Sequence, residues 1–302
     1  MTPGLSDERT IDKLMGYRGR IAPSPTGLLH VGHARTFWAA YERARAEGGT
    51  LILRNEDLDP ERSKDEYVRA ILEDLRWLGI HWDEGPDVGG SAGPYEQSAR
   101  RGFYLDIWRR LLVGGWVYPC RCSRKDLSRI AQAPHEQTVG EVRIEADEGP
   151  MYPGTCRLER AEAARLAEQV VDPAGVNWRF RVPEGEGVMF EDGRFGPQRF
   201  VAGEDFGDFA VWRRDDVPAY QLAVVADDHA MGITDVVRGA DLLLSTARQI
   251  LLYRALGWAE PQWYHCDLVT DAHGERLAKR HDALAIRTLR EQGWTPEAVR
   301  AG

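Results

Sequence analysis

Residues 20–33 read RIAPSPTGLLHVGH, and this stretch decides the expected fold of the 302-residue chain. It joins a short strand over Tyr17–Ala22 to a helical pattern from about Val31 to Glu47. Prolines in the turn stop the strand, and apolar residues spaced three and four apart indicate the helix. A strand, a tight turn and a helix in this order predict a parallel α/β unit with phosphate-binding N–H groups at the start of the helix.

The flanking segments extend this pattern. Thr50–Arg54 is a second apolar strand, and a helix is expected over about Lys64–Leu78. After a helix over Arg100–Val113, the segment 116–156 carries three of the four cysteines and a polar stretch, which indicates an insertion. A helix expected over Arg157–Gln169 and several short strands then precede a return of α/β character after Tyr220. We therefore expect a doubly wound, Rossmann-like parallel sheet with an inserted α+β subdomain.

The composition fits a soluble globular protein. Hydrophobic residues make up 43% and charged residues 29%, and no apolar run is long enough for a membrane span. No secretory signal is visible, so we expect a cytoplasmic protein. The net charge of −9 argues against indiscriminate binding to polyanions. Residues 100–130 are locally basic, with eight Lys/Arg against two Asp, which fits either a solvated helix face or a local RNA footprint.

His30 and His33 lie three residues apart at the expected start of the first helix. On one helical turn both rings can donate to phosphate oxygens, next to unpaired main-chain N–H groups. Gly32 would let a nucleotide approach the main chain closely. A His-x-x-His pair alone is also typical of an exposed pair or half a metal site, but the surrounding strand, turn and helix favour the phosphate interpretation.

These residues resemble the "HIGH" signature of class I aminoacyl-tRNA synthetases, and the preceding RIAPSPTG resembles the glutamate-specific branch. Other landmarks follow in order: RNEDLD at 54–59, YQLAVVADD at 220–228, VRGAD at 237–241, and RLAKR at 276–280 where "KMSKS" is expected. The last departs from the family pattern, because Arg276 and Ala278 replace a lysine and a serine, while the second lysine, Lys279, is retained.

The resemblance implies a two-step reaction, in which a carboxylate of glutamate attacks the α-phosphate of ATP and the acyl-adenylate is then transferred to a nucleic-acid hydroxyl. ATP with Mg²⁺ would be a substrate, and no residue indicates a magnesium site on the protein. The implied ATP-binding residues are His30, Gly32, His33 and Lys279, with His30, His33 and Lys279 catalytic. The implied glutamate-binding residues are Arg20, Ile21, Ala22, Pro23, Ser24, Glu56, Tyr220 and Arg238.

Three cysteines, Cys120, Cys122 and Cys156, suggest one structural zinc ion, which normally takes four S or N ligands. Chemistry alone would prefer His135 as the fourth ligand. The resemblance points to Tyr152 instead, because glutamyl-queuosine tRNA(Asp) synthetases carry a Cys-x-Cys…Tyr-x3-Cys pattern.

The same resemblance implies the division of the chain. Residues 1–115 would form the first half of the catalytic domain, 116–200 an inserted zinc-binding, acceptor-like subdomain, 201–262 the second half, and 263–302 the KMSKS-like loop and a C-terminal helix.

The expected substrate is queuosine in the anticodon of tRNA(Asp), and the expected state is a monomer. Only 22 residues follow Arg280, whereas an anticodon-reading domain needs on the order of 100. Flipped bases would then stack on aromatic side chains, for which Trp108, Trp116 and Tyr118 are candidates. Two alternatives stay open: a truncated glutamyl-tRNA synthetase that charges a tRNA 3′ end, and a non-catalytic tRNA-binding relative.

Overall fold

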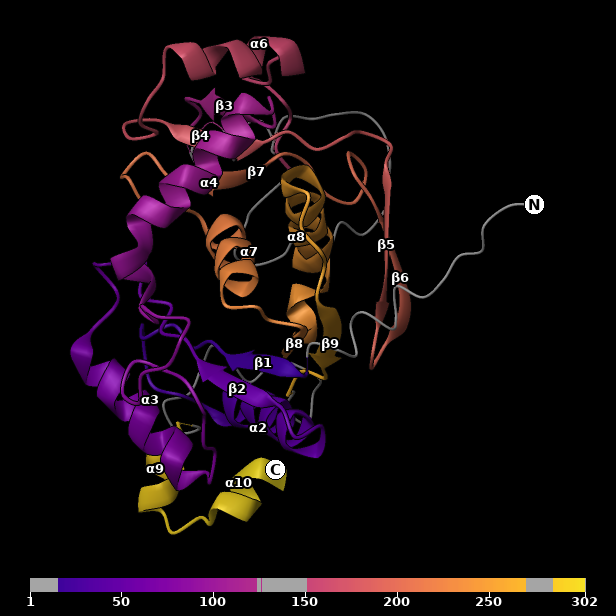
Figure 1. Cartoon of the computed structure of the whole chain (residues 1–302). Coiled ribbons are helices and arrows are strands. Elements are labelled where there is room, and N and C mark those ends of the chain that lie inside the picture. Colours follow the sequence, from indigo (N-terminus) through magenta and orange to yellow (C-terminus); the bar gives the residue numbers. More distant parts are fainter. Residues whose placement is uncertain (1–15, 124–125, 127–150, 270–284, 302) are drawn as a thin grey trace.

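The computed structural model describes residues 16–123, 126, 151–269 and 285–301 (Figure 1). Its larger sheet has six strands in the order β2-β1-β8-β9-β5-β6. Neighbouring strands are parallel except for β6, which runs antiparallel to β5. The bounds are Arg18–Ile21 for β1, Thr50–Leu53 for β2, Gly187–Asp192 for β5, Gly196–Val201 for β6, Asp235–Gly239 for β8 and Gln262–Cys266 for β9.

Helices cover both faces of this sheet. Successive strand residues point to opposite faces, so Leu51 and Leu53 enter one buried cluster and Ile52 enters the other. The first cluster packs under α2, α3, α9 and α10, and the second packs against α7 and α8. Figure 1 shows α2 on the opposite side of β1 and β2 from α7 and α8. The bounds are Val31–Ala46 for α2, Asp65–Trp77 for α3, Tyr220–Ala230 for α7, Leu243–Leu256 for α8, Ile286–Glu291 for α9 and Pro296–Ala301 for α10.

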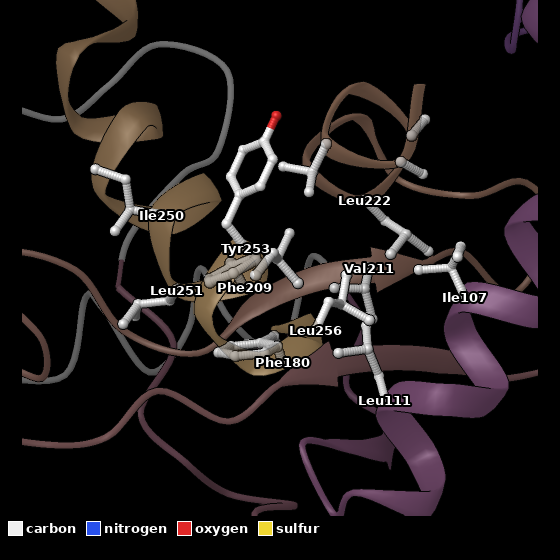
Figure 2. Close-up of a cluster of buried hydrophobic side chains, with 14 of the residues drawn as sticks. Ile107, Leu111, Phe180, Phe209, Val211, Leu222, Ile250, Leu251, Tyr253 and Leu256 are labelled. Carbon is white, nitrogen blue, oxygen red and sulfur yellow. The ribbon is translucent and has the colours of Figure 1, made fainter. Parts of the chain in front are cut away.

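A second, antiparallel sheet has the strand order β3-β4-β7, with bounds Val117–Cys120, Asn177–Phe180 and Phe209–Trp212. It lies beside α4 (Arg101–Val113) and the short α6 (Arg160–Arg165). Figure 2 shows side chains of β4 and β7 packed with residues of α4, α7 and α8. One hydrophobic cluster therefore joins the small sheet to the helices of the large one. Short 3₁₀ turns complete the described elements: η1 at Gln97–Arg100, η2 at Leu166–Glu168 and η3 at Ala240–Leu242.

The mixed, mostly parallel α/β sheet of Rossmann type confirms the predicted fold class, and most predicted helices and strands lie within a few residues of their expected bounds. The boundary expected at residue 200 does not coincide with a boundary between the sheets. The β5–β6 hairpin pairs with β9 of the large sheet, while β7 pairs with β4 of the small sheet. These pairings join residues far apart in the chain, which local patterns do not reveal.

Three further elements differ from the sequence expectation. The helix expected over 157–169 begins at Arg160 and tightens into a 3₁₀ turn after six residues. β3 and α10 were not predicted, because each is only four to six residues long and carries a proline. Among the described helices, none has the length and apolar character needed to cross a membrane.

Replacing Leu111 by Ala should lower the free energy of unfolding by about 2–5 kcal/mol, because it opens a cavity in the cluster shared by the two sheets. Val113→Ala is the matched control on the same helix, since Val113 is 63% exposed, and it should change that free energy by less than about 0.5 kcal/mol. Urea denaturation followed by circular dichroism measures both, and equal shifts in the two variants would contradict this packing.

Candidate functional site

Charged side chains gather where the parallel strands β1, β2 and β8 end. Arg20 lies on β1 and Arg238 on β8, and Arg54 and Glu56 directly follow β2. The carboxyl ends of parallel strands share one edge of the sheet, which is where α/β proteins bind ligands. The candidate site is therefore built on the rigid part of the fold.

Arg54 is the centre of this group and is fully buried. Its Nη1 donates to Oδ1 of Asp228 at 2.6 Å, and its Nη2 donates to Oε1 of Glu56 at 3.0 Å. Burial alone would lower the pKa of Arg54, but the carboxylates of Asp228, Glu56 and Asp227 raise it. Arg54 therefore stays charged and holds the pocket carboxylates in place.

Asp228 links Arg54 to Arg20. The Arg20 Nε donates to Oδ1 of Asp228 at 3.3 Å, and its Nη1 donates to the carbonyl of Val237 at 3.1 Å. Burial acts to raise the pKa of Asp228, but the two arginines bring it below its usual range. Burial raises the pKa of Glu56 despite its contact with Arg54, so a second cation beside Glu56 would stabilise its ionised form.

Arg238 is 5% exposed and is held on several sides. Its Nη1 donates to Oε1 of Gln249 at 2.8 Å, and its Nη2 donates to Oγ1 of Thr246 at 2.7 Å, both on α8. Its Nε donates to Nε2 of His265 at 3.2 Å. Burial lowers the pKa of Arg238, and Tyr220 opposes this shift, so an anion beside the guanidinium would relieve the cost of its desolvation.

Tyr220 opens α7 and is 38% exposed, whereas Arg20 and Arg238 are each 5% exposed. Burial around its hydroxyl raises its pKa, Arg238 and Arg20 oppose this shift, and Glu56 adds to it. The structure thus brings Arg20, Glu56, Tyr220 and Arg238 into one electrostatic cluster.

The turn residues predicted to bind glutamate differ in burial: Ile21 and Pro23 are buried, whereas Ala22 and Ser24 are more accessible. The Ile21 side chain is fully buried in the cluster under α2. Pro23 accepts the N–H of Glu56 at 3.0 Å and so ties the turn to the end of β2. Ala22 is half-buried and Ser24 is exposed.

His30 and His33 form a capping box at the start of α2. Nδ1 of His30 accepts the N–H of Gly32 at 3.1 Å, and Nδ1 of His33 accepts the N–H of His30 at 3.3 Å. Their rings stack with centroids 3.7 Å apart. Because each Nδ1 accepts, the neutral rings carry their protons on Nε2, which makes each Nε2 a donor.

The three clustered cysteines form a compact group with Tyr152. Their Sγ atoms lie within 4.8 Å of one another and could hold a metal ion. Sγ of Cys122 lies 3.6 Å from Sγ of Cys156, and the Tyr152 Oη lies 3.5 Å from Sγ of Cys120. Among the described residues this is the one group of potential metal ligands of this kind.

Several expectations lie outside the described residues, namely Lys279, Arg276, Ala278 and the alternative zinc ligand His135. The three aromatic residues expected to stack on flipped bases lie on described residues, and the structure does not support that role. Trp108 and Tyr118 are fully buried core residues, and Trp116 is stacked on Phe180 and covered by Arg160. None of these three rings is a free stacking platform.

The basic segment 100–130 is also partly neutralised. Arg100 donates to Asp227 at 2.7 Å, and Arg101 forms ion pairs with Asp216 and Asp172. In this part of the segment the structure favours the interpretation as an ion-paired helix over that of an RNA footprint.

Sequence reasoning gave no site role to Arg54 or Asp228, although both lie in quoted landmarks, and it missed Asp192 and His265. Asp228 had a visible signal, since two adjacent aspartates interrupt an otherwise apolar helix and both are buried. Asp192 and His265 had none, because they lie 73 residues apart and meet only through the pairing of β5 with β9.

The chain is similar to known proteins over most of its length. The family model described as tRNA synthetases class I (E and Q), catalytic domain, matches residues 17–302. The chain is 51% identical over 277 residues to a glutamyl-Q tRNA(Asp) synthetase of Nitratidesulfovibrio vulgaris, which covers 91% of this chain and 82% of the relative. A protein of the same name from Symbiobacterium thermophilum is 50% identical, with 93% and 83% covered.

Glutamate–tRNA ligases match over a smaller share of their length. The chain is 45% identical to glutamate–tRNA ligase 2 of Nitrosococcus oceani and covers 57% of it. A crystal structure of glutamate-tRNA synthetase from Elizabethkingia anophelis superposes with a TM-score of 0.72 at 30% identity, covering 92% of this chain and 54% of that one. The chain therefore belongs to the family of class I tRNA synthetase catalytic domains of the E and Q type.

Proposed function

We propose that this protein activates L-glutamate with ATP, without tRNA, and transfers it to queuosine in the anticodon of tRNA(Asp). The observation that carries the proposal is the convergence of Arg20, Glu56 and Arg238 at the ends of three parallel strands. The names of the two relatives at 50–51% identity support the choice of acceptor.

The pocket has the charges that an acidic amino acid requires. Glutamate has two carboxylates and one ammonium, so a selective site needs two cationic donors and one anion. Arg20 and Arg238 would each face a carboxylate, and Glu56 would accept the ammonium. Glutamine would leave one guanidinium facing a neutral amide, and the resulting poor pairing of a buried charge is costly.

Activation needs positioning and charge stabilisation and no covalent nucleophile. A carboxylate oxygen of glutamate attacks the α-phosphorus of ATP, the bond to the bridging oxygen breaks, and pyrophosphate leaves. His30 and His33 would donate from Nε2 to the triphosphate at the N-terminus of α2, where main-chain N–H groups also favour anions. Lys279, which follows β9 in the sequence, would neutralise the charge that develops on the phosphates.

Two assays test the proposal. Pyrophosphate exchange into ATP should occur with glutamate and without tRNA, and should be at least about 100-fold slower with glutamine, because an unpaired buried charge costs about 3–5 kcal/mol. Radioactive glutamate should then label tRNA(Asp) that carries queuosine and leave tRNA(Asp) without it unlabelled. Labelling that ignores queuosine would contradict the proposal.

A second candidate is a short glutamyl-tRNA synthetase that charges a tRNA 3′ end, which the 45% identity to a glutamate–tRNA ligase favours. Nuclease digestion separates the two, because label on the 3′-terminal adenosine would select this candidate and label on the queuosine nucleotide would select the first.

Gly32 has a steric role in the proposed ATP site. A Cβ at this position would lie 2.9 Å from Cε1 of His30, so Gly32→Ala should displace the ring and raise KM for ATP by about tenfold, equivalent to about 1.4 kcal/mol. Gly27→Ala in the same turn is the control, since nothing lies within 4 Å of its Cβ, and its KM should stay at the wild-type value. Equal KM values for ATP in the two variants would contradict this role.

We also propose that Cys120, Cys122, Cys156 and Tyr152 hold one structural zinc ion. Zinc–sulfur bonds of about 2.3 Å in a tetrahedron place sulfur atoms about 3.8 Å apart, and the 3.6 Å between Cys122 and Cys156 fits this geometry. A bound zinc ion would tie the end of β3 to the segment around Cys156.

Purified protein should therefore contain about one zinc ion per chain, and Cys156→Ser should lose most of it, as measured by mass spectrometry of the metal. Cys266→Ser is the control, because Cys266 lies outside the cluster, and it should keep the metal. Retention of zinc in Cys156→Ser would rule out this ligand set.

A further inference from the structure

Arg238 is held from behind by a hydrogen-bonded pair that lies deeper in the protein. Its Nε donates to Nε2 of His265, and Nδ1 of the same ring lies 2.6 Å from Oδ2 of Asp192. All three side chains are buried, and those of His265 and Asp192 are fully enclosed by the protein.

The partners fix the tautomer of His265. A guanidinium N–H only donates, so Nε2 must accept, and an ionised carboxylate only accepts, so Nδ1 must carry the proton. Burial and the charge of Arg238 lower the pKa of His265 to about 4, and the ring is therefore neutral at physiological pH.

Asp192 is anchored independently of Arg238. Its Oδ1 accepts the N–H groups of Arg194 and Phe195 in the turn between β5 and β6, at 3.0 and 2.9 Å. Its Oδ2 also accepts the N–H of His265 at 3.1 Å. Main-chain N–H groups thus fix the orientation of the Asp192 carboxylate. The carboxylate in turn orients the His265 imidazole, and the imidazole holds the Nε edge of the Arg238 guanidinium.

We propose that Asp192 and His265 are positioning residues that aim the Arg238 guanidinium at its carboxylate. The proposal rests on the proposed function for the identity of that ligand. A guanidinium whose Nε side is fixed by His265, and whose Nη atoms are held by Gln249 and Thr246, keeps its orientation before substrate arrives. It therefore loses less entropy on binding than a flexible side chain would.

Two substitutions of His265 distinguish orientation of Arg238 from structural support of the β5–β6 hairpin. In His265→Gln, the side-chain oxygen reaches about the position of Nε2 and can still accept from Arg238, but the contact with Asp192 is lost. In His265→Asn, the amide lies near the position of Nδ1 and can still donate to Asp192, but it cannot reach Arg238. Both variants remove the ring, so each serves as the other's control for packing.

His265→Asn should raise KM for glutamate in pyrophosphate exchange by about tenfold or more, because a hydrogen bond to a charged group is lost. Its kcat and its KM for ATP should stay near the wild-type values. His265→Gln should raise KM for glutamate by a smaller factor of about threefold, since the acceptor remains but Asp192 no longer orients it. If the pair only supports the hairpin, the order reverses and His265→Asn behaves like wild type, which would overturn the proposal.

A spectroscopic measurement tests the hydrogen bonds of His265 without an enzyme assay. The ¹⁵N NMR spectrum of the imidazoles, with His265 assigned by its absence in His265→Asn, should show a protonated Nδ1 and a bare Nε2 from pH 8 down to about 5, and Arg238→Ala should shift the Nε2 signal. Protonation on Nε2, or no shift in Arg238→Ala, would overturn the proposal. A wild-type protein that shows this spectrum but no glutamate-dependent exchange would overturn the proposed function alone.

Discussion

Arg54 places a permanent charge where water does not reach, and the arrangement of the pocket follows from this constraint. A buried guanidinium is tolerated only when carboxylates surround it, and Asp228, Glu56 and Asp227 do so. Each of these carboxylates has a second role as well. Asp228 accepts from Arg20, Glu56 interacts electrostatically with Tyr220, and Asp227 accepts from Arg100 and Tyr104. Removing Arg54 would leave three acidic groups without their shared counter-charge.

The elements that local patterns predict are those whose apolar spacing is complete within the element. The helix expected over Lys64–Leu78 is the example, since Ile71, Leu75 and Leu78 recur at helical intervals and are buried. The placement of β5 beside β9 could not be predicted in this way, because it depends on a pairing between Asp192 and Trp263. Hydrogen bonds between distant strands leave no trace in the local sequence of either strand.

The candidate site likewise contains residues that the sequence could reveal and residues that only the fold brings together. The two histidines were found because their chemistry is local. Arg20 and Arg238 were assigned to one site only by the family resemblance, and in the structure both lie near the carboxyl ends of parallel strands. The residues alone could not decide whether Tyr152 or His135 is the fourth zinc ligand, since both lie in or beside a polar stretch. The contact of Tyr152 with Cys120 favours Tyr152. The support behind Arg238 was also hidden, because a histidine and an aspartate carry no signal until the fold joins them.

The continuous apolar cluster of Figure 2 also limits how this enzyme could be shortened. Phe180 and Phe209 of the small sheet stack on each other and pack in the same cluster as Leu222 and Leu251. Excising residues 116–212 would strip that cover from α7 and α8 and would also remove the β5–β6 hairpin. The inserted sheet is thus not a detachable module, and a minimal adenylating core would need a redesigned apolar surface on both helices.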